Sequence, residues 1–484
     1  MMFWVKTIFP FINKHKNTIL FSAFLSIYLL LGMYILLYND IIINEWDIIF
    51  DADSPRVYWD FFSLDANHYR VGVHPFMLML LQPIFNILKG LFVSQRFTLI
   101  FVQSIVVSLL VILIKEIMFR LIKNEKLSFL VSIIFGISFS SLIFVAIPET
   151  YIFGSLFVLL LLKLVLDIKE RNSLRKKDIL TLSLLSISAF GIIPVLIIPV
   201  VFLLFYLLTS LYAKYGQVLK RFFQILLVML VCYFSFSFLQ KLSFPNSPIF
   251  FKGVAQEDVN YINKDNSSNK VQNIIIGFFV QPIYSLSFSN VEFSGRSNGL
   301  LRFSGKDSPY KFIPSIFLFL FPLIYGLINK KNLWKYKKEF IYLSIILISF
   351  MVCNYYYGNS SVFLYSQNFL IYIVILLGLL YSFCSARIIN IVLPIFITYQ
   401  GLINFVSVNK VANFASFNAE KHCNFFILIL FSLIVTMLFL VAFNLGKRFI
   451  VKYGIRIGFE DVIYGYYLIV FIAMLFLALF HGRV

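Results

Sequence analysis

Long apolar stretches recur from one end of this 484-residue sequence to the other. Most run for close to the 20 or so residues that an α-helix needs to cross about 30 Å of hydrocarbon. Strands of a membrane β-barrel would instead alternate apolar and polar residues. The pattern therefore predicts an all-α polytopic membrane protein with about 11–13 transmembrane helices. The predicted helices are 18–38, 97–117, 127–147, 151–168, 179–191, 195–212, 222–242, 311–329, 341–357, 368–384, 388–406, 424–446 and 462–480.

Composition and charge support this interpretation. Hydrophobic residues make up 60% of the chain and charged residues 13%, against about 25% charged in soluble domains. The net charge of +19 does not indicate a nucleic-acid partner, because Lys and Arg gather in short loops, as the positive-inside rule expects. The four cysteines are scattered without metal-ligand spacing, so neither a disulfide framework nor a zinc site is indicated.

The basic loops predict the topology. The lysines before the first helix place the N-terminus in the cytoplasm, and the basic loop at 120–126 is cytoplasmic as well. Two apolar stretches, 74–93 and 97–117, lie between the first outer loop (39–73) and that basic loop, yet the charges require an odd number of crossings. The stretch 74–93 contains two prolines, a glycine and a lysine, so we expect it to lie along the outer interface without crossing.

Three regions follow from this layout. Residues 1–242 form a transmembrane module with the acidic first outer loop 39–73. Residues 243–310 form a large outer loop with an apolar patch at 274–287, and residues 311–484 supply the C-terminal helices.

The first outer loop is the strongest candidate for chemistry. It holds seven of the 22 acidic residues of the chain. A solvated loop accounts for the first three, whereas those from Asp51 onward alternate with aromatic residues typical of a membrane interface. A partly desolvated carboxylate there is suited to act as a base or to bind a hydroxyl group.

Other polar residues are predicted on the same side. Glu149 in the turn AIPETY needs a partner so near the membrane, and a turn glutamate reaching water is the alternative. Cations on the outer side would suit a lipid phosphate, although for any one of them an ordinary surface role is the more common one. The tyrosine-rich turn at 355–368 could line a sugar pocket or belong to an interfacial aromatic belt. The candidate substrate-binding residues are Arg56, His68, Arg70, His74, Glu149, Tyr151, Arg296, Arg302 and Tyr365.

The order of these features resembles the GT-C superfamily of integral membrane glycosyltransferases, which includes protein O-mannosyltransferases, aminoarabinose transferases and oligosaccharyltransferase catalytic subunits. The matching pieces are the acidic loop followed by VHPFMLMLLQPIF (73–85), the helix that ends in basic residues (95–126), and AIPETY. They cover roughly the first 170 residues. The chain departs from the family pattern in having Asp-Ala-Asp at 51–53 and an isolated Glu149.

The resemblance implies a glycosyltransferase that uses a polyprenyl-phosphate-linked sugar as donor, with its active site on the outer face of the membrane. The chain has 59 Phe and much Ile, Asn and Lys, a composition common in bacterial surface-polysaccharide loci. We therefore expect a multi-pass protein of the bacterial cytoplasmic membrane that acts on a cell-surface glycan or lipid-linked acceptor.

Carried over to this sequence, the catalytic acid of the first loop falls on Asp51 or Asp53. Asp53 is preferred as the base, because Arg56 follows it by three residues, and Asp51 is the reserve. Arg70, His74, Arg296 or Arg302 would hold the phosphate, and Glu149 would hold sugar or acceptor hydroxyls. No cofactor is indicated, and no metal ligands are assigned, although a divalent metal is compatible with the family. The alternatives are an O-antigen or polysaccharide polymerase and a lipid-linked oligosaccharide flippase.

Overall fold

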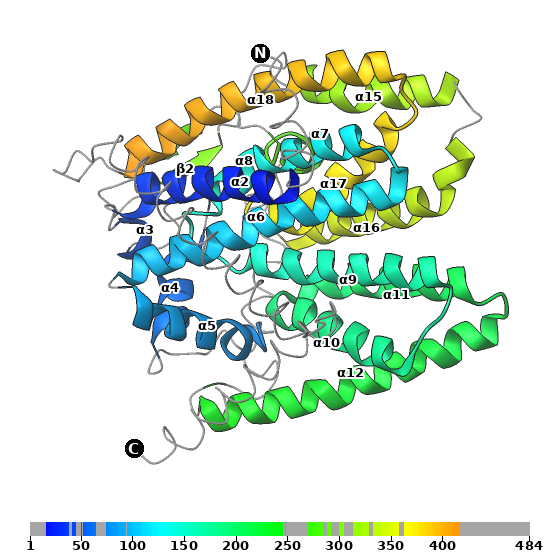
Figure 1. The fold of residues 1–484 in the computed structure, drawn as a ribbon. Coiled ribbons are helices and arrows are strands. Elements are labelled where there is room, and N and C mark those ends of the chain that lie inside the picture. Colours follow the sequence, from blue (N-terminus) through cyan, green and yellow to red (C-terminus); the bar gives the residue numbers. More distant parts are fainter. Residues whose placement is uncertain are drawn as a thin grey trace, which may run out of the picture.

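The structure, a computed structural model, is a bundle of long helices with one short antiparallel hairpin (Figure 1). It describes residues 16–37, 41–44, 50, 52–63, 74–92, 94–244, 247, 270–283, 288–291, 300–303, 313–328, 333–357 and 363–415. The helices are α2 (Lys16–Gly32, continued by a π-helical turn, Met33–Leu37), α3 (Ile41–Asn44), α4 (Ser54–Phe62), α5 (Met77–Leu91), α6 (Gln95–Ile122), α7 (Glu125–Gly136), α8 (Phe139–Ile143), α9 (Tyr151–Arg171), α10 (Lys176–Ile192), α11 (Ile197–Leu211), α12 (Tyr215–Ser243), α14 (Lys270–Phe279), α15 (Ile313–Ile328), α16 (Lys337–Tyr357), α17 (Ser366–Tyr381) and α18 (Ala386–Ala415). Short 3-10 turns precede α11 (Pro194–Leu196) and α16 (Leu333–Tyr336), and strand β1 (Phe288–Val291) pairs with β2 (Leu300–Phe303).

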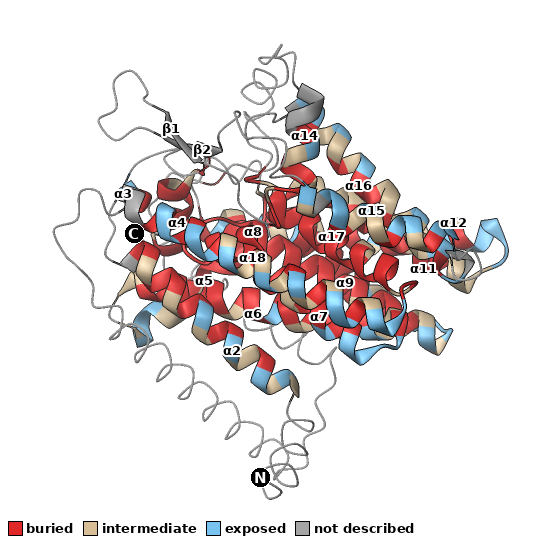
Figure 2. Ribbon diagram, turned by 90° about the horizontal axis from the view of Figure 1, so that it is seen from above, coloured by how far each residue is buried: buried red, intermediate tan, exposed pale blue. Residues whose placement is uncertain are grey.

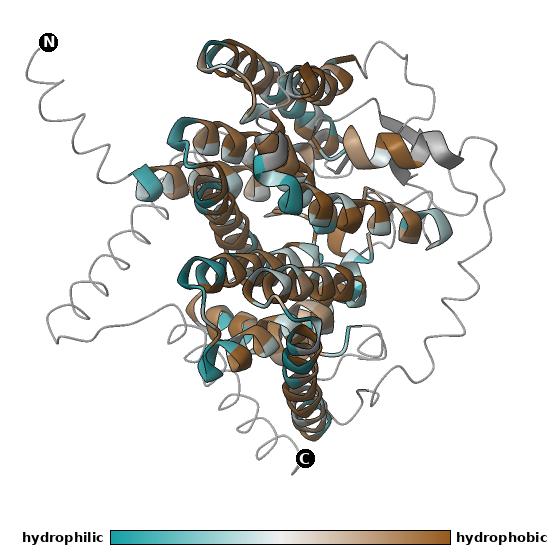
Figure 3. Ribbon diagram, turned by 90° about the vertical axis from the view of Figure 1, so that its right-hand side faces the viewer, coloured by the Kyte–Doolittle hydropathy of each residue, from teal (hydrophilic) through white to brown (hydrophobic). Residues whose placement is uncertain are grey.

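The prediction of a helical polytopic membrane protein is confirmed. Within the described residues, seven helices are long and apolar enough to cross a membrane, and three shorter apolar helices accompany them. Buried residues gather at the centre of the bundle, and α12, at its edge, has much of its apolar surface exposed (Figure 2). Apolar residues dominate the helices seen nearly end-on, with hydrophilic residues near their ends (Figure 3).

One end of the bundle, which we call the basic end, collects the helix termini that carry Lys and Arg. There the start of α2 meets the end of α6, because Lys16 Nζ lies 2.9 Å from Glu125 Oε1 and Lys115 Nζ donates to Asn17 Oδ1 at 2.6 Å. At the opposite end, which we call the distal end, a Cβ on Gly32 would lie 2.6 Å from Ile100. Helices α2 and α6 are therefore antiparallel, as their charges predict.

This arrangement decides the role of α5. Since α2 ends and α6 begins at the distal end, the chain between them starts and finishes on one side. Tyr58 of α4 donates to Gln95 Oε1 at 3.3 Å, and Gln82 of α5 donates to the Ser63 carbonyl at 2.9 Å, so both short helices stay at that end (Figure 1). The prediction that 74–93 does not cross is confirmed.

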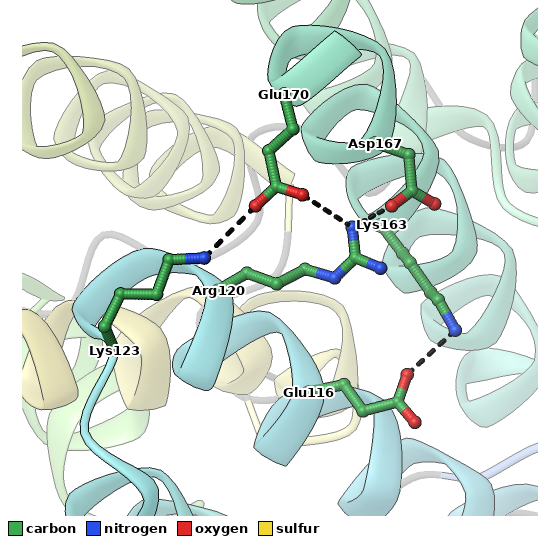
Figure 4. A network of polar contacts seen from close by, with 6 residues as sticks. All are labelled: Glu116, Arg120, Lys123, Lys163, Asp167 and Glu170. Carbon is green, nitrogen blue, oxygen red and sulfur yellow. Dashed lines mark hydrogen bonds and ion pairs between the residues drawn. The ribbon is translucent and has the colours of Figure 1, made fainter.

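Ion pairs clamp the helices at the basic end (Figure 4). Lys163 Nζ lies 2.8 Å from Glu116 Oε2, and this ion pair joins α9 to α6. These side chains are partly exposed, and each such pair contributes only about 0–1 kcal/mol. The remaining pairs of this network are Arg120 with Asp167 and Glu170, and Lys123 with Glu170.

The single helix predicted at 127–147 is wrong, because the segment breaks into α7 and α8. Gly136 ends α7 where the Phe24 ring of α2 packs so closely that a Cβ would lie 2.3 Å from it. Ser138 then caps α8 by accepting from the Ser141 amide at 3.3 Å. The break leaves carbonyl groups without partners inside the helix. It is tolerated because side chains of other helices donate to these carbonyls, and such pairing is obligatory in an apolar medium. The donors are Tyr28 to Gly136, Gln400 to Ile134 and Asn404 to Ile137, at 2.7–2.9 Å.

The second half agrees with prediction where it is described. The helix pair that turns at Pro194 is present as α10 and α11, and the helices predicted from 311 to 406 correspond to α15–α18. Helix α14 occupies part of the predicted apolar patch at 274–287. The predicted helices 424–446 and 462–480 lie outside the described residues.

Candidate functional site

Asp53 stands at the N-terminus of α4, where Pro55 favours the start of a helix. Its carboxylate makes no capping hydrogen bond and instead lies 2.5 Å from Nη2 of Arg56. The Asp53 side chain is 31% exposed, whereas the Arg56 side chain is only 9% exposed. The arginine therefore supports the acid from within the protein, and the carboxylate remains accessible.

Glu149 lies against the same helix start from the other side. It is buried, and its Oε1 accepts from the backbone N–H of Asp53 at 3.1 Å while its Oε2 accepts from the N–H of Thr150 at 3.4 Å. Asp53 and Thr150 are the N-cap residues of α4 and α9, so one carboxyl group joins two helix N-termini. The prediction that Glu149 faces the first loop is supported by this geometry.

The two carboxyl groups have different electrostatic surroundings. The pKa of Glu149 is raised to about 8, chiefly by burial and secondly by the charge of Asp53, while Arg56 and the two backbone N–H groups act in the opposite direction. Glu149 is therefore mostly protonated at pH 7. Asp53 is instead partly exposed and ion-paired with the Arg56 guanidinium. Two neighbouring acids with such different environments are suited to different tasks.

Aromatic packing fixes the turn that leads into this site. Phe50 has a φ of 54°, a left-handed conformation that is strained for a bulky residue and costs about 1–3 kcal/mol. Its ring lies 4.8 Å from the Phe363 ring and 5.9 Å from the Phe139 ring, measured between centroids. These contacts join the loop before α4 to the starts of α8 and α17.

Two predicted tyrosines complete the arrangement, which we call the Asp53–Glu149 site and define by Asp53, Arg56, Glu149, Tyr151 and Tyr365. Tyr151 begins α9 and lies near enough to the other four for electrostatic interaction. The Tyr151 and Tyr365 rings meet edge to face, with centroids 5.5 Å apart. Residues up to 312 positions apart in sequence are thus brought together at the distal end.

Other predicted residues are elsewhere or undescribed. His74 sits at the junction of α5 and α10, where Nδ1 is 2.6 Å from the Ile192 carbonyl; since a carbonyl only accepts, Nδ1 carries the proton. The backbone of Arg302 belongs to β2, and its side chain is not described. Asp51, His68, Arg70 and Arg296 lie outside the described residues.

Sequence reasoning passed over two buried polar residues near the site. Asp60 is 1% exposed and follows Asp53 by seven positions, which places both on one face of α4. Asn368, in the first turn of α17, is fully buried. Two signals in the sequence could have indicated these residues. Asp60 has helical spacing from Asp53, and Asn368 directly precedes the apolar run FLIYIVILL.

Among the described residues, the donors at this site are few for a divalent metal. Calcium and magnesium take six or more ligands, mostly oxygens, whereas this site offers two carboxyl groups, one ion-paired with arginine and the other hydrogen-bonded to two amides. Among the described residues, no three His, Cys, Asp or Glu side chains form a cluster that could hold a metal ion. We therefore derive no chemical step through a metal.

Comparison with known proteins adds little to this geometry. No family model matches the sequence, and no curated protein matches it. Among solved structures, the crystal structure of the Archaeoglobus fulgidus oligosaccharyltransferase in the apo form is similar over 95% of this chain and 56% of that one, with 12% identity and a TM-score of 0.38. The chain thus spans little more than half the length of that structure. The likeness is too distant to carry an argument about activity.

Proposed function

We propose that this protein is a membrane glycosyltransferase of the GT-C type. It transfers a sugar from a polyprenyl-phosphate-linked donor to a cell-surface glycan or lipid-linked acceptor. In this proposal it resides in the bacterial cytoplasmic membrane, its basic end faces the cytoplasm, and the Asp53–Glu149 site works on the outer face. The positive-inside rule supports this orientation.

One observation carries the proposal. An accessible carboxylate, ion-paired with a buried arginine, stands beside a buried carboxyl group at the end of the bundle opposite the basic end. The acid is presented on a short helix that follows the first crossing helix without itself crossing, as the sequence resemblance implies. A flippase needs no such helix and is expected to consist of two similar halves.

The chemistry follows from these groups. Asp53 accepts the proton of the acceptor hydroxyl as its oxygen attacks the anomeric carbon of the donor sugar. The bond between that carbon and the phosphate oxygen breaks, and the polyprenyl phosphate leaves with the electron pair. Arg56 has a buried Nε–H without a hydrogen-bond partner among the described residues, so a donor remains to stabilise negative charge.

Glu149 has a different task in this mechanism. Because its pKa of about 8 keeps it mostly protonated at pH 7, it can donate a hydrogen bond to a sugar hydroxyl while accepting from the Asp53 amide. It also avoids placing a second negative charge beside the base. Tyr151 and Tyr365 supply aromatic surface for the sugar, and Arg70, His68, His74, Arg296 and Arg302 stay predicted phosphate or substrate contacts.

The test is whether surface glycans depend on Asp53. Cells lacking the gene are complemented with the wild-type protein, Asp53→Asn, or Glu170→Gln, a control that removes a carboxylate at the basic end. Surface glycans are compared by mass spectrometry at matched protein levels in the membrane. We expect the wild type and the control to restore one sugar modification and Asp53→Asn to lose it.

Two outcomes would contradict the proposal. Full modification by Asp53→Asn would remove Asp53 as the base. A glycan profile that does not change with the gene would reject glycosyl transfer altogether. A change in chain length without loss of a sugar unit would favour a polymerase.

A further inference from the structure

One face of α17 carries three polar side chains in succession from the Asp53–Glu149 site inward. Tyr365, Asn368 and Tyr372 are spaced at i, i+3 and i+7, so they project from the same side of the helix. Tyr365 is partly exposed and contacts Tyr151, whereas Asn368 and Tyr372 are completely buried. We call these three residues the buried α17 face.

The two inner residues lack hydrogen-bond partners among the described residues. Both amide atoms of Asn368, Nδ2 and Oδ1, are buried and unpaired, and so is the hydroxyl of Tyr372. Most buried polar atoms in proteins are paired, because leaving one unpaired destabilises the folded state. Two such residues in adjacent turns indicate a group that the protein accommodates at some stage of its work.

The opposite side of the same helix shows what a structural polar residue looks like. Gln367 donates from Nε2 to Ser140 Oγ at 3.0 Å, and its backbone carbonyl accepts from Ser155 at 2.8 Å. Ser366 and Ser140 are joined at 2.6 Å. On this side the Gln367 amide nitrogen, the Gln367 backbone carbonyl and the Ser366 hydroxyl are engaged within the bundle, although Gln367 Oε1 is buried without a partner among the described residues. Neither the side-chain amide atoms of Asn368 nor the Tyr372 hydroxyl are engaged in this way among those residues.

The surroundings define the chemistry of the missing partner. Asn368 can donate and accept, and Tyr372 can do both through one hydroxyl. The Tyr372 ring lies 6.0 Å from the Phe350 ring, and the Tyr365 ring meets Tyr151. No residue of the buried α17 face carries a charge, so the ligand group is neutral, rich in hydroxyls and suited to aromatic surfaces. Those are the properties of a sugar ring and not of a phosphate.

We propose that the buried α17 face binds the sugar moiety of the substrate, with Asn368 as the residue that hydrogen-bonds its hydroxyls and Tyr372 as a second contact. The assignment deepens the proposed function and rests on it. The sugar enters past Tyr365, the only member of this face that is partly exposed. Its reacting carbon then remains near Asp53, while the ring hydroxyls reach the first turns of α17.

The experiment separates binding from structure, because an unpaired buried polar group destabilises the empty protein. The variants are Asn368→Leu and Tyr372→Phe. The matched control is Tyr381→Phe, since Tyr381 is another fully buried tyrosine of α17 whose hydroxyl lacks a partner among the described residues, but at the basic end. Thermal midpoints are measured on the purified full-length protein in detergent, and sugar modification is measured in the complemented cells.

We expect all three variants to keep or raise the midpoint of the ligand-free protein. Modification should fall at least about tenfold for Asn368→Leu and severalfold for Tyr372→Phe, and Tyr381→Phe should retain it. A midpoint several degrees lower in Asn368→Leu would show a structural role and overturn the assignment. Full modification by Asn368→Leu beside an inactive Asp53→Asn would reject the sugar subsite alone, whereas full modification by Asp53→Asn would reject the proposed base.

Adding a sugar-bearing probe identifies which substrate the face serves. Decaprenyl-phosphate-glucose, decaprenyl-phosphate-mannose and decaprenyl phosphate alone represent the donor, and the free glycan from the deletion strain represents the acceptor. If the face binds the donor sugar, a sugar-linked lipid should raise the thermal midpoint of the wild type more than decaprenyl phosphate does. That additional rise should be absent in Asn368→Leu. If it binds the acceptor, the rise with the glycan is lost instead. Equal shifts in the wild type and Asn368→Leu with every stabilising probe would overturn the proposal.

Discussion

Replacing Glu149 with glutamine should make stability less dependent on pH. The pKa of Glu149 is raised from an ordinary value of 4.5 to about 8, chiefly by burial. Between these two values the folded protein keeps a proton that the unfolded chain releases, so stability falls as pH rises and levels off above about 8. At 1.36 kcal/mol for each pH unit, the whole loss is about 5 kcal/mol. Glutamine resembles the protonated acid and does not titrate.

The measurement is the thermal midpoint of purified wild-type and Glu149→Gln protein from pH 4 to pH 9.5, followed by intrinsic fluorescence. The titration of every other group affects both proteins alike, so the difference between their midpoints reports on Glu149. The two midpoints should be similar near pH 4, diverge in favour of the variant from pH 5 to pH 8, and keep a constant gap above that. Parallel curves across the whole range would refute a protonated Glu149.

Three further predictions concern other parts of the structure. With the four native cysteines replaced, Lys89→Cys should react with a membrane-impermeant reagent on intact cells and Lys176→Cys should not; the reverse pattern would contradict the orientation. Arg56→Lys keeps the charge but not the Nε donor, so modification should fall at least about tenfold at equal protein level, and unchanged activity would show that the donor is dispensable. Asn404→Leu removes the side-chain donor of the Ile137 carbonyl and one of the donors to the Ile283 carbonyl, so it should lower the thermal midpoint. Arg120→Ala removes two partly exposed ion pairs and should change it little; equal effects would refute this ranking.

The crossing pattern could be predicted because it depends on properties of short segments. Length and hydropathy indicate which stretches can span, and the basic loops give their direction. The basic loops require an odd number of crossings between residues 39 and 126, and this requirement was sufficient to identify the non-crossing stretch at 74–93 without any tertiary information. It depended on two charged loops, and the contacts of Lys16 and Lys115 support the same alignment of α2 and α6.

The site was only partly accessible to such reasoning. The i, i+3 spacing was sufficient to predict the pairing of Asp53 with Arg56, and the two residues are ion-paired. The contact between Glu149 and the Asp53 amide joins positions 96 apart, so no local pattern could have established it. The sequence shows only that Asn368 precedes an apolar run, whereas its lack of hydrogen-bond partners among the described residues is a property of the folded chain.

The break between α7 and α8 explains why one prediction failed and also how Glu149 reaches Asp53. A continuous helix over 127–147 would satisfy its own carbonyls and would need no help from α2 or α18. Tyr28, Gln400 and Asn404 instead donate to the Gly136, Ile134 and Ile137 carbonyls, so these three groups stay paired where the chain leaves the helix. The return to the distal end is completed by α8 and by the non-helical residues 144–150. Glu149 therefore sits on an irregular turn before α9, and its carboxyl group is held between two helix starts. The same polar residues of α18 that look unremarkable in an apolar helix are thus positioning elements for the proposed active site.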